Sequence, residues 1–476
     1  MKLLRLITLA ILVTNFSYPA DGQSQDGPMR TVLTNCNIID CTGSPVQENM
    51  TVVISGNEIS SITEGVYRPS QNEDSVRVID LEGAYVLPGF WNMHLHLSVM
   101  FPPNHSLDNE SLPAKVIRAG VNAMDGLRHG FTSIQSLGEI EYIDAAWRDV
   151  FAQGFLMGPR IFASGEVVAP TAGMRGTIPA VLTKPSGDIA AGVDGPAAIR
   201  KAVRTRIQNG VDIIKIINYE MLPDELEAVV ETAHSFGIPV TAHSREPAIY
   251  QAVQAGVDCI EHGYGLSDET IKLMAGKGTF FDPTIICNLD EQYIKEREGR
   301  LAKLGYSDDE QIVRLRTAIA YEDERSPEHA LHQRNALLKA AKAGVKLLIG
   351  SDSAPVGEIG ILEMEQFVLS GVSEMQTLIA ATRNGADMVG LLDRLGTVEE
   401  GKLADLVIVA DNPLENISNI RKVKMVFKDG ISVDLDHPLG TARYWDYFEI
   451  PGYSKGYLGT AENAAGFRRG QAEPPK

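Results

Sequence analysis

The chain has 476 residues, of which 44% are hydrophobic and 22% are charged, and its formal net charge at pH 7 is −19. This length can bury a large core and fits an α/β barrel of about 250 residues with a smaller second domain. The negative charge argues against nucleic acid or an anionic membrane surface as partner, because both need a basic patch.

The N-terminus is typical of an export signal. Lys2 and Arg5 precede an apolar stretch at residues 6–16, which is too short to span a bilayer. Small residues follow at the expected cleavage point. We therefore predict a signal peptide at residues 1–22, a secreted or periplasmic protein and no stable membrane anchor, with an uncleaved anchor as the alternative.

Cysteine usage gives little support to a metal site made of thiolates. The cysteines are Cys36, Cys41, Cys259 and Cys287, and no two of them form a C-x-x-C pair. In an oxidising compartment Cys36 and Cys41 can form a disulfide, but the sequence alone leaves this open.

From residue 91 onward, strand patterns alternate with helix patterns. Strands are expected at residues 91–96, 130–135, 160–164, 211–217, 239–243, 258–262, 279–284 and 345–350. Helices are expected at residues 112–129, 140–153, 196–209, 223–235, 247–254, 268–275 and in an insertion at 289–343, with a long loop at 165–195. This alternation predicts an α/β fold, a parallel sheet closed into a (β/α)8 TIM barrel. An open doubly wound sheet would need a glycine-rich phosphate turn after its first strand, and none is present.

The first of these strands carries two histidines, His94 and His96. Alternate side chains of a strand point to the same face, so the two imidazoles project together. Imidazole is a common ligand of zinc and similar ions, and two imidazoles on one face make half of a metal site. The alternative is a pair of histidines that are simply packed or hydrogen-bonded.

Further polar residues lie on later strands of the predicted barrel. In a barrel of this kind, functional side chains gather where strands end, on the C-terminal face. Each one alone has an ordinary explanation, such as a helix cap for an aspartate. Their joint position at one rim favours a functional site, formed with the two histidines above by Lys215, His243, His262 and Asp352.

These segments resemble the metal-dependent amidohydrolase superfamily. The resemblance runs from about residue 31 to residue 430, and its nearest branch is prolidase-like and imidazolonepropionase-like, including ochratoxin-hydrolysing relatives. The motifs that carry it are Pro-Gly-Phe-Trp-Asn-Met-His-Leu-His at 88–96, Ile-Ile-Lys-Ile at 213–216, Thr-Ala-His at 241–243, Ile-Glu-His-Gly at 260–263, Gly-Ser-Asp at 350–352 and the segment 396–407.

The resemblance implies a second domain built from both ends of the chain. Its parts are residues 31–82 and 396–436, which are strand-rich and lack helical periodicity, so we predict a small β-sandwich with a hairpin around Gly56-Asn57. The barrel domain is then expected at residues 83–395. The aromatic tail at 437–476 is expected to pack on the barrel.

The resemblance also implies a ligand set and a mechanism. His94, His96 and Asp352 hold one divalent ion, and His243 and His262 hold a second, with zinc as the expected metal. Lys215 is carboxylated by CO2 or bicarbonate and bridges the ions. A bridging hydroxide attacks a carbonyl, and Asp352 acts as general base and then as general acid. The expected reaction is hydrolysis of an amide or peptide C–N bond.

Substrate contacts are less well defined. Related peptidases carry a Gly-His pair where this chain has Gly173-Met174, and a tyrosine or histidine where it has Arg245, so a simple dipeptidase assignment does not follow. Arg245 and Arg175 can bind a substrate carboxylate, with surface salt bridges as the alternative. Tyr219 is a candidate to polarise the carbonyl oxygen, and packing in its loop is the alternative.

The expected substrate is a small molecule, an N-acyl amino acid or a dipeptide-like amide, and the chain is expected to form a homo-oligomer. Lactam, ester or phosphotriester hydrolysis is an alternative, and a catalytically silent binding protein is another. If Asp352 only caps the next helix, the next candidates for proton transfer are His105, His129 and Glu261.

Overall fold

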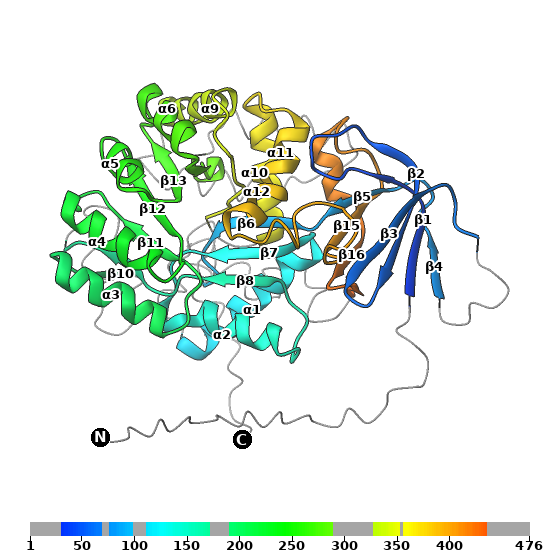
Figure 1. Cartoon of the computed structure of the whole chain (residues 1–476), viewed down its shortest axis with the longest axis horizontal. Helices are drawn as coiled ribbons and strands as arrows, with labels where there is room; N and C mark the ends of the chain where they lie inside the picture. The colour runs from blue at the N-terminus through cyan, green and yellow to red at the C-terminus, as the bar shows by residue number, and fades with distance from the viewer. Residues whose placement is uncertain are drawn as a thin grey trace, which may run out of the picture.

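The computed structural model describes residues 30–68, 76–98, 111–171, 190–288, 327–352 and 356–435. A strand-rich body joins an α/β body that carries the helices (Figure 1). The predicted signal peptide and the predicted C-terminal tail lie outside the described residues, as do His105, Met174 and Arg175. Among the helices of the described part, none is long and apolar enough to cross a membrane.

The strand-rich body is one sheet with the order β17-β16-β15-β5-β1-β2-β3, and β4 pairs with β1. It combines strands from both ends of the chain, which lie side by side in Figure 1. Its strands are β1 (Arg30–Ile38), β2 (Gln47–Ser55), β3 (Glu58–Glu64), β4 (Val76–Asp80), β5 (Tyr85–Pro88), β15 (Leu406–Val409), β16 (Val423–Lys428) and β17 (Ile431–Ser432). Strand β5 extends the sheet past the domain boundary that we predicted at residue 82.

Hydrogen bonds join these strands into one continuous sheet. Strand β1 pairs with β4 through residues 30–34 and with β5 through residues 37–38, and this change of partner folds the sheet over its core. The core includes Leu33, Ile54 and Phe427, each at most 1% exposed. The hairpin expected at Gly56-Asn57 is confirmed, since Ser55 pairs with Glu58.

The two cysteines of this sheet do not form the disulfide that the sequence left open. Cys36 and Cys41 are both free and buried. Burial raises the pKa of each thiol to about 12. Their thiols are therefore protonated at neutral pH and act as small apolar side chains in the core.

The α/β body contains parallel strands in two hydrogen-bonded groups. One group has the order β6-β7-β8 and the other has the order β10-β9-β11-β12-β13-β14. The bounds are β6 (Phe90–Leu95), β7 (Phe131–Ser136), β8 (Arg160–Ala163), β9 (Val167–Ala169), β10 (Ala190–Gly192), β11 (Ile214–Ile217), β12 (Val240–Arg245), β13 (Cys259–Tyr264) and β14 (Phe280–Asp282). Strands β9 and β10 lie in the segment that we predicted to be a loop, because runs of three residues are too short to stand out by pattern.

Individual backbone hydrogen bonds connect the two groups at two places, as expected for a (β/α)8 barrel. Asp212, which precedes β11, donates its amide hydrogen to the carbonyl of Ala163 in β8 at 2.7 Å. At the second place, residues 345–350 lie between β14 and β6. Leu348 donates to the carbonyl of Phe281 at 2.8 Å, and Met93 donates to the carbonyl of Ile349 at 2.6 Å. The predicted eighth strand therefore lies between its expected neighbours, although its strand pairing is limited to one isolated bridge, between Leu347 and Phe281.

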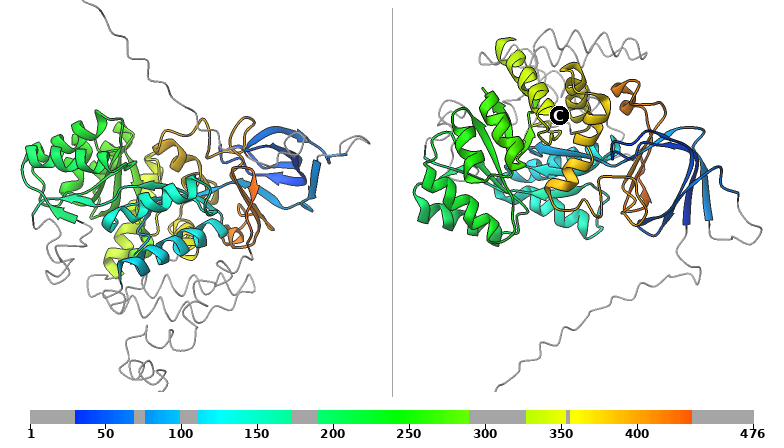
Figure 2. Two further views of the ribbon diagram at one scale, coloured as in Figure 1. Left: turned by 90° about the horizontal axis from the view of Figure 1, so that it is seen from below. Right: turned by 45° about the horizontal axis from the view of Figure 1, so that its top comes forward.

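Helices surround the strands of the barrel (Figure 2). They are α1 (Leu112–Arg128), α2 (Ile143–Ala152), α3 (Pro196–Gln208), α4 (Pro223–His234), α5 (Ala248–Ala255), α6 (Asp268–Lys277), α9 (Pro327–Lys342), α10 (Val356–Leu369), α11 (Glu374–Ala380) and α12 (Arg383–Met388), with short 3-10 turns at η2 (Ile140–Tyr142), η3 (Ile285–Asn288) and η4 (Ile417–Arg421). Proline at the start of α3 and α4 suits the first helical turn, where no amide donor is needed. The helices predicted between residues 112 and 275 are thus confirmed, with shifts of a few residues at their ends.

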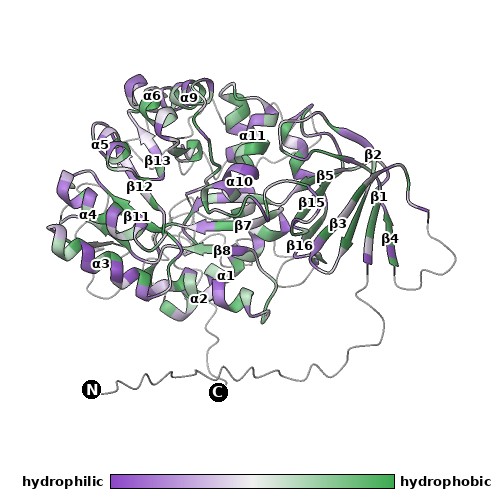
Figure 3. Cartoon of the chain, viewed as in Figure 1, coloured by the Kyte–Doolittle hydropathy of each residue, from purple (hydrophilic) through white to green (hydrophobic). Residues whose placement is uncertain are grey.

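Apolar residues run along the strands, while the helices carry both polar and apolar residues (Figure 3). Helix α1 shows the pattern, because Ala119, Ala123 and Leu127 are buried at helical spacing. Their burial against the barrel strands fixes the strands relative to the helices. The strand ends therefore form a rigid rim on which side chains can be placed accurately.

Candidate metal centre

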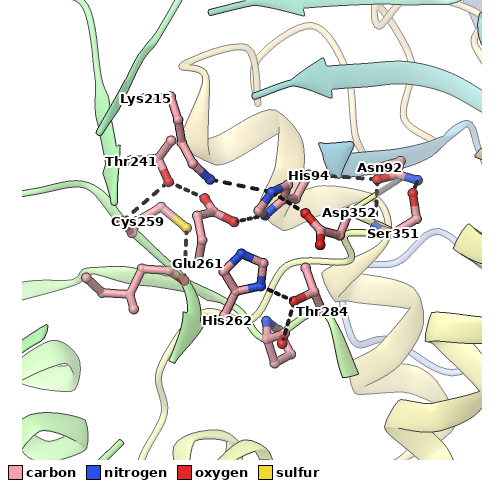
Figure 4. Close-up of polar contacts among 12 residues, drawn as sticks. Asn92, His94, Lys215, Thr241, Cys259, Glu261, His262, Thr284, Ser351 and Asp352 are labelled. Atoms are coloured by element: carbon pink, nitrogen blue, oxygen red, sulfur yellow. Dashed lines mark hydrogen bonds and ion pairs between the residues drawn. The ribbon is translucent and has the colours of Figure 1, made fainter. Parts of the chain in front are cut away.

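Five elements bring the predicted polar residues together, and Figure 4 shows four of these residues: His94, Lys215, His262 and Asp352. Each strand β6, β11, β12 and β13 contributes at least one of these residues, and Asp352 follows the bridging segment 345–350. Three of them form the tightest group, because the ligand atoms of His94, His262 and Asp352 all lie within 4.8 Å of one another. Two imidazoles and a carboxylate at this distance are a donor set that suits a divalent metal ion.

The remaining predicted residues surround this group. His96 Nε2 lies 3.4 Å from Asp352 Oδ1, while His94 Nε2 lies 3.0 Å from the same oxygen. Lys215 Nζ lies 3.5 Å from His94 Nε2. The rings of His243 and His262 are 4.3 Å apart. All the predicted ligands thus lie in one cluster, although His96, Lys215 and His243 are outside the tightest group.

Hydrogen bonds to the ring nitrogens decide which nitrogen of each histidine faces the cluster. Nδ1 is bonded in three cases: in His94 to Glu261 Oε2 at 2.7 Å, in His96 to the carbonyl of Gly138 at 2.9 Å, and in His262 to Thr284 Oγ1 at 2.6 Å. This leaves Nε2 of each ring as the nitrogen for a ligand. His243 is the reverse, because Tyr219 contacts its Nε2 at 2.6 Å and leaves Nδ1.

The backbone of the rim is held in unusual conformations. His262, Thr284 and Asp352 have φ values of 63°, 44° and 59°, in the left-handed region that is unfavourable for side chains larger than glycine. Such residues cost on the order of 1–3 kcal/mol each and persist only where surrounding contacts fix them. Gln333 of α9 supplies such a contact, since its amide donates to the carbonyls of His262 and Pro283.

Asp352 is placed by a brace on the neighbouring strand. Asn92 Nδ2 donates to Ser351 Oγ at 2.8 Å, and the amide of Ser351 donates back to Asn92 Oδ1 at 3.2 Å. The amide of Asp352 also donates to the carbonyl of His94 at 2.7 Å. Sequence reasoning missed Asn92, although its position two residues before His94 on one strand was a usable signal.

Burial sets the charge of the basic groups in the cluster. Loss of solvent lowers the pKa of the Lys215 amine, which is 2% exposed, while the nearby carboxylates of Glu261 and Asp352 oppose this shift. Burial and neighbouring basic groups hold the pKa values of His243 and His262 well below the usual 6.5. Both histidines are therefore neutral at physiological pH, which is the state that binds a metal.

The acidic groups in and below the cluster differ from one another. Burial opposes ionisation of Asp352, but His94 and the hydrogen bonds from the His94 and His96 rings outweigh burial and hold the pKa of this carboxyl well below its usual value. Burial raises the pKa of Asp282, whose two carboxyl oxygens have no hydrogen-bond partner among the described residues. Asp352 is thus the ionised acid that faces the histidines, and the donor chemistry of the cluster fits a divalent cation.

Beside the cluster, the ends of β11, β12 and β13 carry side chains of a different kind. The guanidinium carbon of Arg245 lies 4.6 Å from the ring centre of Tyr219. The ring of Tyr264 is stacked on His262 at 5.0 Å with an interplanar angle of 5°. Arg245 is exposed, so it can reach a molecule that approaches the cluster from solvent. His129 instead bonds to the carbonyl of Asp125 at the end of α1.

Histidines, a lysine and an aspartate at the strand ends of a barrel are typical of metal-dependent hydrolases. Residues 85–433 match the model of the amidohydrolase family, and the chain belongs to that family. The family is metal-dependent, and this chain is a hydrolase in which two histidines and an aspartate are close enough to hold a metal ion.

Individual relatives agree with this assignment. The chain is 26% identical over 448 residues to ochratoxinase of Aspergillus niger, covering 85% of this chain and 86% of the relative. It is 22% identical over 408 residues to imidazolonepropionase of Thermoplasma volcanium, covering 80% and 90% of the two chains. Among solved structures, a Xaa-Pro dipeptidase with bound methionine has a TM-score of 0.70 and 30% identity, covering 85% of this chain and all of the other.

Proposed function

We propose that this hydrolase cleaves the C–N bond of a small amide, either an N-acyl amino acid or a dipeptide-like compound. The observation that carries the proposal is the convergence of His94, His262 and Asp352 within 4.8 Å, with Lys215 Nζ at 3.5 Å from His94. The similarity to a Xaa-Pro dipeptidase supports an amide of this size.

The cluster would hold two divalent ions, with zinc as the expected metal. His94, His96 and Asp352 would bind one ion, and His243 and His262 the other. When bound, the ions would polarise a carbonyl group and lower the pKa of water from 15.7 toward about 7. The donor set supports this proposal, because it consists of imidazoles that are neutral at physiological pH and an ionised carboxylate.

Lys215 would bridge the two ions as a carbamate, formed from its amine and CO2 or bicarbonate. Only a neutral amine can react in this way, and burial favours the neutral form of Lys215. An ammonium group 3.5 Å from His94 Nε2 would also repel ions bound beside it. Both considerations favour the modified lysine in the loaded enzyme.

Asp352 would accept a proton from the attacking water and deliver it to the leaving nitrogen. Its ionised state and its place at 3.0 Å from His94 Nε2 support this role. The proton thus moves between atoms that Asp352 can reach, and no second acid is required.

Tyr219 would donate a hydrogen bond to the substrate carbonyl. For His243 to bind a metal through Nδ1, its Nε2 must carry the proton, so the Tyr219 oxygen must accept that hydrogen bond. The phenol O–H is then available to donate a hydrogen bond to the substrate carbonyl. Arg245 beside the same ring would bind a substrate carboxylate, and Arg175 and Met174, outside the described residues, would line the same region.

A second candidate is opening of a cyclic amide, which the similarity to imidazolonepropionase favours. A hydrolysis screen decides between the two, with dipeptides, N-acyl amino acids, lactams and esters offered in the presence of zinc and bicarbonate. We expect turnover to be fastest for acyclic amides that carry a free carboxylate. Turnover of lactams alone would contradict the first candidate, and no turnover of any class would favour a silent binding protein.

We also propose that the enzyme is exported and forms a homo-oligomer. The export proposal depends on the sequence pattern of residues 1–22. Removal of these residues should leave folding intact and abolish export, as measured by cell fractionation. Loss of folding in the truncated protein would contradict it.

A further inference from the structure

Glu261 lies directly below the candidate metal centre, in the interior of the barrel. It belongs to β13, and its side chain is 1% exposed. Both carboxylate oxygens are engaged: Oε2 lies 2.7 Å from His94 Nδ1, and Oε1 accepts from Thr241 Oγ1 (Figure 4). Glu261 therefore has a fixed position between β12 and β6.

We propose that Glu261 is a positioning residue that sets the tautomer and the ring orientation of His94 for metal binding. An ionised carboxylate can only accept hydrogen bonds, so His94 Nδ1 must carry the proton. Nε2 is then the nitrogen that would bind the ion, and any proton that it shares with Asp352 Oδ1 at 3.0 Å would be displaced on binding. Without an acceptor at Nδ1, both tautomers of the neutral ring become available, and only one of them can bind.

The geometry separates this role from proton transfer, for which Glu261 was an alternative candidate on sequence grounds. His94 stands between Glu261 and Asp352, since Nδ1 faces the first and Nε2 faces the second. The oxygens of Glu261 are thus occupied on the side of the ring away from Asp352. Glu261 acts through His94 and does not touch the substrate.

The partner of His94 also differs in kind from the partners of the other histidines in the cluster. His96 is bonded to a backbone carbonyl, His262 to a threonine hydroxyl and His243 to a tyrosine hydroxyl. Of these four partners on the side away from the cluster, only that of His94 is a carboxylate, whereas Asp352 contacts His94 and His96 on the side that faces the cluster. A hydrogen bond to a charged acceptor is about twice as strong as a neutral one, so this ring is held most firmly.

The charge of Glu261 has a second consequence for the buried site. Two divalent ions bring four positive charges, against which Asp352 and a carbamate at Lys215 supply two negative charges. Glu261 supplies a third within the same interior, where uncompensated charge is expensive. The carboxylate should therefore strengthen metal binding by its charge as well as by the orientation of His94.

This inference rests on the proposed metal centre, and its test is the metal affinity of the purified full chain. The dissociation constant for zinc is measured by competition with a chelator of known affinity, with thermal unfolding of the metal-free protein as a check of folding. The substitutions are Glu261→Met, which removes the acceptor and the charge, and Glu261→Gln, which keeps an acceptor and removes the charge. Thr241→Val is the matched control, because it removes the hydroxyl that contacts Glu261 Oε1 and the Cys259 carbonyl but leaves the contact between Glu261 and His94.

We expect Glu261→Met to weaken zinc binding about 10- to 100-fold, the range for a lost partner of a metal-binding histidine. Glu261→Gln should lose about three- to tenfold, less than Glu261→Met because an acceptor remains, whereas Thr241→Val should stay within about threefold of the unsubstituted chain. Equal affinity in all three variants and the unsubstituted chain would overturn the proposal for Glu261. An equal loss in Thr241→Val and Glu261→Met would overturn it as well, since general packing would then be responsible.

Two outcomes remain distinct. If the unsubstituted chain itself binds no zinc, the proposed metal centre fails, whatever the variants do. If Glu261→Met does not fold, Glu261→Gln decides alone, because it has the same shape as glutamate. An affinity of Glu261→Gln within twofold of the unsubstituted chain then contradicts the contribution of charge.

Discussion

The sheet at one end of the molecule and the rim of the barrel are built by opposite rules. The sheet has an apolar core in which Leu33, Val86 and Ile408 are fully buried. The rim buries ionisable groups, and buried polar atoms without a hydrogen-bond partner in the described residues include those of Asp282 and Gln135. The first arrangement lowers the free energy of the fold, and the second raises it.

Backbone strain occurs in both regions but has a different setting in each. In the sheet body, left-handed φ values occur at Asn35 and Asn49, whose type tolerates them, and also at Cys41. At the rim they occur at His262 and at the β-branched Thr284, beside the buried ionisable groups. Strain together with buried charge is characteristic of a functional site. The comparison indicates that the sheet mainly stabilises the fold, whereas the rim of the barrel carries the groups suited to catalysis.

Substitution of Lys215 should have the largest effect on the rim. Lys215→Ala removes the bridge between the two proposed ions, so we expect loss of activity and of most of one metal equivalent. Added short carboxylic acids with metal should restore part of the activity, because they can occupy the place of the carbamate. Metal analysis and turnover assays measure both effects, and full activity in the variant would rule out the bridging role.

The next largest effect is expected at Asp352. Asp352→Asn keeps the shape of the side chain but cannot accept a proton, so kcat should fall at least about 100-fold with little change in KM. The pH–rate profile should also lose its acidic limb. That limb arises because Asp352 must be ionised to accept the proton, and its pKa is held below the usual value. Near-normal turnover in the variant would contradict the role of Asp352 in proton transfer and would favour the alternative that it only caps the next helix.

A smaller effect is expected at Arg245, on the edge of the rim. Arg245→Met keeps much of the length of the side chain and removes the charge, so KM for a substrate with a free carboxylate should rise about tenfold. For the same substrate with its carboxylate amidated, KM should not change. An equal change of KM for both substrates would assign Arg245 to packing against Tyr219 instead.

The smallest effect on chemistry is expected in the sheet. Ile54 is 1% exposed in the sheet core, and Ile54→Ala should lower the free energy of unfolding by about 2–5 kcal/mol. Zinc affinity and kcat should stay within about twofold at a temperature where the variant is folded. Denaturant unfolding and the zinc competition assay test the two halves of this prediction. A parallel loss of zinc affinity would show that the two regions are coupled.

The sequence predicted the position of the cluster but not the contacts that hold it. His94, His262 and Asp352 could be found because strand ends of a barrel meet at one rim, so order along the chain is enough. The contact between His94 and Glu261 joins residues that are 167 positions apart. The contact between Gln333 and the carbonyl of His262 depends on where helix α9 packs. Such contacts depend on packing, which leaves no local pattern.

The same limit applies to the fold. The alternation of strands and helices predicted the barrel, because each strand must be covered by a helix. The short strands β9 and β10 and the irregular pairing of residues 345–350 were not predicted, since their hydrogen bonds depend on neighbours far away in the sequence. The change of partner along β1 was missed for the same reason.

The central claim is that hydrolysis depends on a binuclear metal centre at the rim. Its most direct test is metal analysis of the full chain purified with zinc, combined with turnover measured before and after treatment with a strong chelator. The account predicts about two equivalents of zinc per chain, loss of turnover on chelation, and recovery with zinc, manganese or cobalt. Undiminished turnover after the metal has been removed would contradict the claim, and a stable content of one equivalent would reduce the centre to a single ion.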